Sequence, residues 1–78
     1  MQNNESMPKR TFKLKTSTFA ILGDQDNRSV VTIPARSLVT LVVGDPEGDG
    51  FVKIRYRDRI LLMFAIDLRT RGSLEQSL

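Results

Sequence analysis

The chain has 78 residues, no Cys, no His and a formal net charge of +3. Without Cys and His it has no disulfide bonds, no Cys/His metal site, and neither the thiol nucleophile nor the imidazole base that enzymes use most often. A chain this short buries only about 60% of its unfolded surface, so its stability must come from a compact sheet, from oligomerisation, or from both. We therefore predict one non-enzymatic domain that holds no cofactor and no metal.

The two ends of the chain have the composition of tails. Residues 1–9 are polar and reach Pro8 near their end, which predicts a disordered tail before a domain over 10–72, and residues 73–78 predict a second, frayed tail. Met1 and Met7 are both possible starts. No apolar run approaches the roughly 20 residues of a membrane span, and the N-terminus has no apolar signal core. We expect a cytoplasmic protein with no membrane contact.

Between the tails lie five segments with the residue types of β-strands. They are 11–22, 28–33, 37–43, 51–57 and 60–65. Turn signals separate them: a Gly/Asp/Asn cluster at 23–27, an acidic loop at 44–50, and a tight three-residue reversal at 57–59. Residues 67–72 have the pattern of a single helical turn closed by Gly72. Short strands at this spacing predict an all-β fold, a small five-stranded barrel with a short 3-10 turn near its C-terminus.

The strand 51–57 alternates apolar and cationic side chains. Successive side chains of a strand leave on opposite faces, so Val52 and Ile54 should face the core and the cations should face outward. The candidate anion- or partner-binding residues are Lys53, Arg55, Arg57 and Arg59. Two interpretations stay open: a stripe that contacts nucleic acid phosphates, or the ordinary polar face of a strand. Tyr56 falls on the apolar phase, so we expect no exposed aromatic between the cations for base stacking.

The strand 60–65 and the residues after it form a run, Ile60–Ile66, that is apolar on both phases. One phase should contribute to the core, whose expected members are Val39, Leu41, Val52, Ile54, Ile60, Leu62 and Phe64. The other phase then needs a cover, and its candidate interface residues are Leu61, Met63 and Leu38. The cover is either the N-terminal segment around Phe12 and Leu14 or a second subunit. We expect a homo-oligomer, with a dimer favoured, because small cores need help.

The loop Asp45-Pro-Glu-Gly-Asp-Gly50 has acids at positions 1, 3 and 5 of a calcium loop and Gly at position 6. The twelfth position is Tyr56 rather than a bidentate Glu, and the ninth is Lys53, so we expect a solvated turn and not a metal site. This acidic loop directly precedes the cationic strand. The two charge sets are nearly balanced, which also suits docking of the strand onto the loop of a second subunit.

The order of these segments resembles an SH3-like barrel over roughly residues 18–72, and in particular short bacterial SH3-type proteins. Residues 31–43 resemble the entry into the second long strand, 47–55 the acidic loop and third strand, and 62–68 the strand before the 3-10 turn. The resemblance implies a protein-interaction and self-assembly module, with nucleic-acid binding as the alternative. Ala65 and Leu68 stand where Pro and Tyr of an SH3 peptide groove are expected, so we expect no PxxP ligand.

Overall fold

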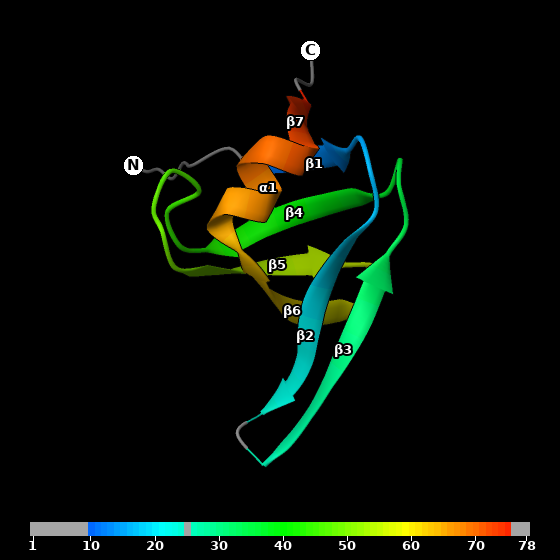
Figure 1. Ribbon diagram of the computed structural model, residues 1–78, viewed down its shortest axis with the longest axis vertical. Coiled ribbons are helices and arrows are strands. Elements are labelled where there is room, and N and C mark those ends of the chain that lie inside the picture. Colours follow the sequence, from blue (N-terminus) through cyan, green and yellow to red (C-terminus); the bar gives the residue numbers. More distant parts are fainter. Residues whose placement is uncertain (1–9, 25, 76–78) are drawn as a thin grey trace, which may run out of the picture.

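The computed structural model describes residues 10–24 and 26–75. These residues form an all-β fold with one short helix, as the sequence predicts. In chain order the elements are β1 (Arg10–Leu14), β2 (Thr18–Asp24), β3 (Asn27–Ile33), β4 (Leu38–Val43), β5 (Phe51–Tyr56), β6 (Arg59–Phe64), α1 (Ala65–Arg71) and β7 (Gly72–Glu75) (Figure 1). The parts of the expected tails at 1–9 and 76–78 lie outside the described residues.

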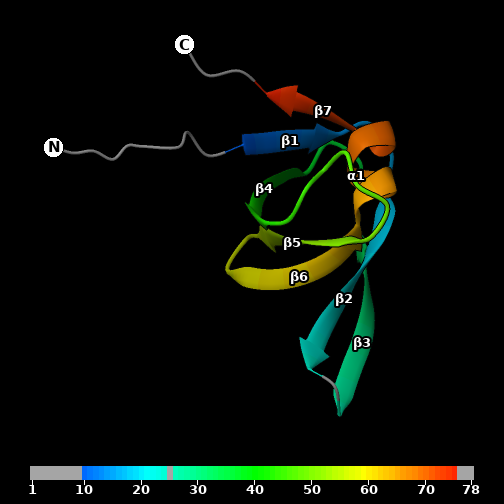
Figure 2. The ribbon, with the colours of Figure 1, turned by 90° about the vertical axis from the view of Figure 1, so that its left-hand side faces the viewer.

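The strands form one antiparallel sheet in the order β3-β2-β6-β5-β4-β1-β7. The expected closed five-stranded barrel is wrong, because the edge strands β3 and β7 do not pair and the sheet stays open. The segment 11–22 is two strands that pair with different neighbours, and the β2–β3 hairpin extends away from the rest of the sheet (Figure 2). β2 joins the sheet through the single register pair Ile21–Leu62 on β6.

The C-terminal part of the described chain differs from expectation in two ways. α1 is a seven-residue α-helix rather than a 3-10 turn: it buries Ala65 and Leu68, and an exposed ion pair at 3.5 Å joins Arg71 to Asp67 one turn earlier. Leu68 accepts a hydrogen bond from the backbone N–H of Gly72 where the helix ends. β7 then pairs with β1 through Glu75, so residues 73–75 belong to the sheet.

The core lies on one face of the sheet and under α1. Its buried members are Phe12, Leu14, Ala20, Ile33, Val39, Val52, Ile54, Leu61, Met63, Ala65 and Leu68. The predicted core positions Val39, Val52 and Ile54 are confirmed, and Leu41 packs against this cluster as a partly buried residue.

The predicted phase of β6 is wrong. Leu61 and Met63, expected at an interface, are each only 1% exposed in the core, whereas Ile60 and Phe64, expected in the core, are 43% and 48% exposed. The cause is the length of the β5–β6 turn. Tyr56 pairs with Arg59, so the turn holds two residues rather than three. Changing the loop by one residue shifts the register by one and moves every β6 side chain to the opposite face.

Candidate interaction surface

The face of the sheet opposite the core, here called the outer face, carries a row of paired residues across four strands. Leu62 pairs with Lys53 on β5 and with Ile21 on β2, and Ile21 pairs with Val30 on β3. Residues that pair across neighbouring strands project to the same side, so this row continues from β5 to the edge strand β3. Three of its four members are apolar, and Val30 is 72% exposed.

Three phenylalanines lie beside this row, at the end of the sheet nearest α1. Phe51 pairs with Phe64, and their rings stack with centroids 4.5 Å apart. Both rings are about half exposed, and Phe19 on β2 is 65% exposed. The side chains surround an open hollow of about 210 Å³. We call the set the apolar patch; its members are Phe19, Ile21, Val30, Phe51, Leu62 and Phe64.

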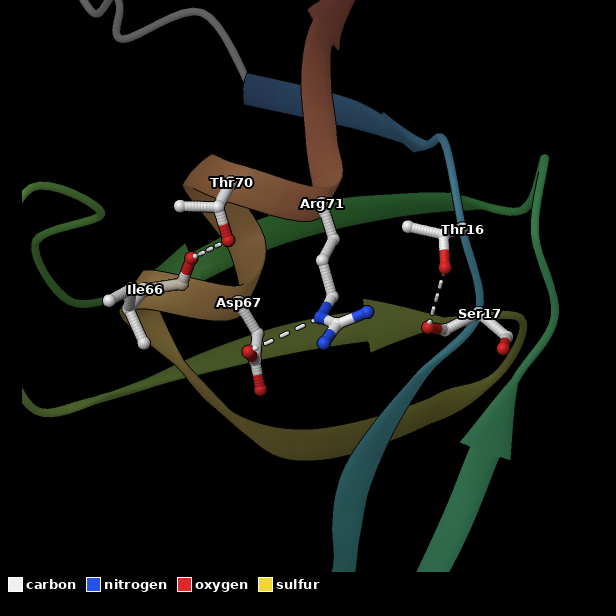
Figure 3. Close-up of polar contacts among 6 residues, drawn as sticks. All are labelled: Thr16, Ser17, Ile66, Asp67, Thr70 and Arg71. Carbon is white, nitrogen blue, oxygen red and sulfur yellow. Dashed lines mark hydrogen bonds and ion pairs between the residues drawn. The ribbon is translucent and has the colours of Figure 1, made fainter.

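Asp67 reaches the rim of the same hollow from the first turn of α1. Its carboxylate lies 3.5 Å from Nε of Arg71, and the hydroxyl of Thr70 donates a hydrogen bond of 2.6 Å to the carbonyl oxygen of Ile66 (Figure 3). Both contacts lie within α1 and are exposed. The ion pair stabilises the helix locally, and the Asp67 carboxylate gives the otherwise apolar hollow one charged edge.

Strand β1 does not cover the apolar patch. Phe12 and Leu14 are buried in the core at 7% and 1% exposure. Their strand β1 pairs with β4 and β7, away from β6 and β2. Leu61 and Met63, for which the sequence predicted a cover, lie in the same buried cluster as Phe12 and Leu14, so the intrachain cover exists on the core face, and the apolar patch is the other face. Within 10–24 and 26–75, the patch faces outward: four of its side chains are exposed, and Ile21 and Leu62 are partly exposed.

The four candidate cations do not form one stripe. Lys53 and Arg55 lie on the outer face, opposite Leu62 and Ile60 of β6. Arg57 sits in the turn with a positive φ of 58°, and its guanidinium carbon is 5.5 Å from the ring centroid of Tyr56. Arg59 pairs with Tyr56 and so falls on the opposite phase from Lys53 and Arg55. The structure thus brings two of the four together on one face.

The third expected interface residue, Leu38, is 55% exposed at the start of β4. It pairs with Lys13 of β1 and is therefore separated from the β6 part of the outer face by β5 and most of β4. Leu38 stays exposed as expected, but it lies outside the apolar patch.

The acidic loop is held at the end of the sheet where β5 begins. The side chain of Arg69 donates hydrogen bonds from Nη1 to the carbonyl oxygens of Pro46, at 3.1 Å, and Gly48. Within the loop, Asp45 accepts hydrogen bonds from the backbone N–H of Glu47 at 2.9 Å and of Gly48 at 3.0 Å. These bonds fix the backbone and leave the loop carboxylates exposed.

Gly44 sets the direction in which the chain leaves β4. Its φ is +118°, which only glycine adopts without strain, and a Cβ there would lie 2.8 Å from Cγ1 of Val52. β4 and β5 also lose regular register between Leu41 and Val43, a β-bulge that bends the strand before the loop. In the described part of the chain, no three acidic side chains gather closely enough to hold a metal ion.

The sequence reasoning missed the exposed phenylalanines. Phe51 shares the odd-numbered phase of Lys53 and Arg55, so the alternation of β5 already contained that signal. A three-residue β5–β6 turn predicts Phe64 in the core, whereas the two-residue turn of the structure places it on the outer face. Tyr56 lies on the apolar phase as predicted, but Phe51 and Phe64 lie beside the cations and share the outer face with Lys53.

Comparisons of the chain with protein-family models, with curated proteins and with solved structures found no match. No helix in the described part of the chain is long and apolar enough to cross a bilayer.

Proposed function

We propose that this chain is a non-enzymatic interaction module that assembles with a second copy of itself through the apolar patch. The observation that supports the proposal is the patch itself: six apolar side chains lie side by side on one sheet face, and two of them form a stacked phenylalanine pair. Contiguous exposed apolar surface of this kind marks interaction sites, whereas single exposed apolar residues are ordinary.

The apolar area of the two exposed rings corresponds to a free energy of the same order as the cost of association. A phenylalanine side chain buries about 150–250 Å² when fully covered, so half-exposed Phe51 and Phe64 each offer roughly 100 Å². At about 25 cal/mol per Å², each ring contributes about 2.5 kcal/mol when covered. A two-fold contact uses both rings twice, which gives about 10 kcal/mol before the association cost of about 4–15 kcal/mol is subtracted.

The test replaces one ring of the stack. Phe64→Ser removes a half-exposed ring from the patch, and Leu74→Ser removes a side chain of similar exposure, 51%, on the opposite edge strand β7. Size-exclusion chromatography with light scattering should give a dimer for the parent and for Leu74→Ser, and a monomer for Phe64→Ser. A parent protein that is monomeric at high micromolar concentration would contradict the proposal.

We also propose a relationship to SH3-like domains. It is supported by the order of the elements. β4, β5 and β6 are consecutive antiparallel neighbours, the acidic loop connects β4 to β5, and α1 follows β6, as the sequence resemblance implies. The proposal concerns ancestry of the sheet and not a peptide groove, because the exposed aromatic side chains on this sheet, Phe19, Phe51 and Phe64, are phenylalanines of the outer face.

A second candidate function is binding of single-stranded nucleic acid by the same face. It is favoured by one observation: exposed Phe19, Phe51 and Phe64 share the outer face with Lys53 and Arg55, and such surfaces combine base stacking with phosphate contacts. Phosphate binding weakens steeply with salt, whereas burial of apolar surface does not. A salt titration of an oligonucleotide complex therefore separates the two functions.

A further inference from the structure

The charged residues in the loop before Phe51 are acidic, and those that follow Phe51 along β5 and into the turn are basic, apart from Asp58. Asp45, Glu47 and Asp49 precede Phe51 at two-residue spacing, and Lys53, Arg55 and Arg57 follow it at the same spacing. Such a pattern is complementary to its own reversed copy. Because the backbone turns at residues 45–48 and does not extend β5, a two-fold operation near Phe51 sets the acidic loop of one copy as a whole against the β5 cations of the other. An isologous contact is the interface type that requires this self-complementarity.

The fold keeps the two charge sets apart within one chain. The acidic loop is anchored beside α1 by Arg69, at the β5 end that carries Phe51. Arg57 lies at the other end of β5, about 20 Å away at roughly 3.3 Å per residue. The stacked pair Phe51–Phe64 lies between the loop and the cations. One chain is thus acidic at one end of the patch and basic at the other.

Among the described residues, no ion pair neutralises either charge set. The ion pair found among residues 10–24 and 26–75 is Arg71–Asp67, which belongs to α1. The side chains of Lys53 and Arg55 are exposed on the outer face, and the carboxylates of Glu47 and Asp49 are exposed in the loop. Both sets remain available for a partner of opposite sign.

We propose that two copies pair with their β5 strands antiparallel, so that the acidic loop of each faces Lys53 and Arg55 of the other. The inference rests on the proposed function, and it names the partner geometry that the apolar patch alone does not fix. A second copy fits this surface better than nucleic acid does, because a phosphate backbone lying along β5 would meet the exposed acids of the loop as well as the cations.

The experiment uses two charge-reversed variants of the full chain. The first carries Lys53→Glu with Arg55→Glu, and the second carries Glu47→Lys with Asp49→Lys. Each variant alone places like charges against one another in the dimer, and its self-association should weaken on the order of 100-fold. In an equimolar mixture one chain's native acidic loop meets the other's native cations, and the two reversed sets meet each other. The mixture should therefore restore a heterodimer of near-parental affinity, measured by analytical ultracentrifugation.

The outcomes separate the inference from the proposed function. If the parent dimerises and both variants dimerise equally well, the charge pairing is wrong but the apolar dimer stands. If the variants are monomeric and their mixture stays monomeric although circular dichroism shows folded protein, the antiparallel arrangement is wrong. If the parent is monomeric throughout, the proposed function itself fails. Binding of a mixed-sequence single-stranded oligonucleotide that Lys53→Glu with Arg55→Glu abolishes, with assembly unchanged, would assign the cations to nucleic acid and overturn the inference.

Discussion

Substitution of two adjacent β6 residues by Glu should have opposite consequences, because the register places them on opposite faces. Met63 is 1% exposed and opposite Val52 in the core, whereas Leu62 is partly exposed on the outer face opposite Lys53. Met63→Glu should therefore unfold the domain. Leu62→Glu should leave it folded and, under the proposed function, monomeric.

The magnitude follows from burial. Removing a fully buried methionine loses about 1.5–3 kcal/mol of transfer free energy. The introduced carboxylate has no cation beside it in the core and adds a cost of several kcal/mol, whether it stays ionised or takes up a proton. At about 0.05–0.15 kcal/mol per residue, a domain of this size has a free energy of unfolding of about 4–12 kcal/mol. Met63→Glu removes most or all of that stability, whereas the partly exposed Leu62 position should change it by about 1 kcal/mol or less.

Urea unfolding followed by far-ultraviolet circular dichroism measures both variants. Fluorescence of Tyr56, the chain's single tyrosine, gives a second probe because that ring packs against the core. Met63→Glu should show no folded baseline at room temperature. If Met63→Glu melts like the parent and Leu62→Glu unfolds, the two-residue turn and the register derived from it are wrong.

Two further predictions concern the acidic loop. Gly44→Ala should lower the free energy of unfolding by about 1–3 kcal/mol, because the φ of Gly44 is +118° and a Cβ there would collide with Val52. The control Gly50→Ala places its Cβ in open space and should change the free energy of unfolding little. Equal urea midpoints for the two variants would contradict this prediction. Arg69→Ala removes the donor to two loop carbonyls and should speed amide hydrogen exchange in the loop. The control Arg71→Ala breaks only the ion pair with Asp67 and should leave exchange in the loop unchanged. Unchanged protection in Arg69→Ala would show that the loop keeps its shape without Arg69.

Much of the fold follows from local sequence rules. Alternation along 51–57 predicts the inward phase of Val52 and Ile54, and β-branched residues with a Gly-rich stop predict β4. The helical turn near Gly72 is also predicted, although α1 begins at Ala65 and completes two turns. These features depend on neighbours within a few residues, which is the range over which sequence patterns carry information.

The errors arise where one residue or one long-range pairing decides the outcome. A run such as Ile60–Phe64 is apolar on both phases, so alternation cannot orient it, and only the length of the β5–β6 turn does. Arg57 occupies a left-handed conformation in that turn. Arginine adopts this conformation infrequently, and no local sequence signal predicts it here. The same error affects the candidate site. The sequence predicts Leu61 and Met63 on the outer face, and the structure places Leu62 and Phe64 there instead.

Barrel closure is the second such case. The five-strand expectation joined 11–22 into one strand, yet β1 and β2 lie at different places in the sheet, separated by β4, β5 and β6. Nothing local marks that separation beyond the short break at 15–17. Which strands pair across the domain depends on long-range packing, and so does the exposure of Phe19 on β2.

The most direct test of self-association through the apolar patch is a dilution series of the unmodified protein followed by amide NMR spectra. Between high micromolar and submicromolar concentration, the resonances of Phe51, Leu62 and Phe64 should shift together with one midpoint, while those of β7 residues such as Leu74 stay constant. Spectra that do not change with concentration, or changes confined to β7 or to the β3 edge, would contradict the account.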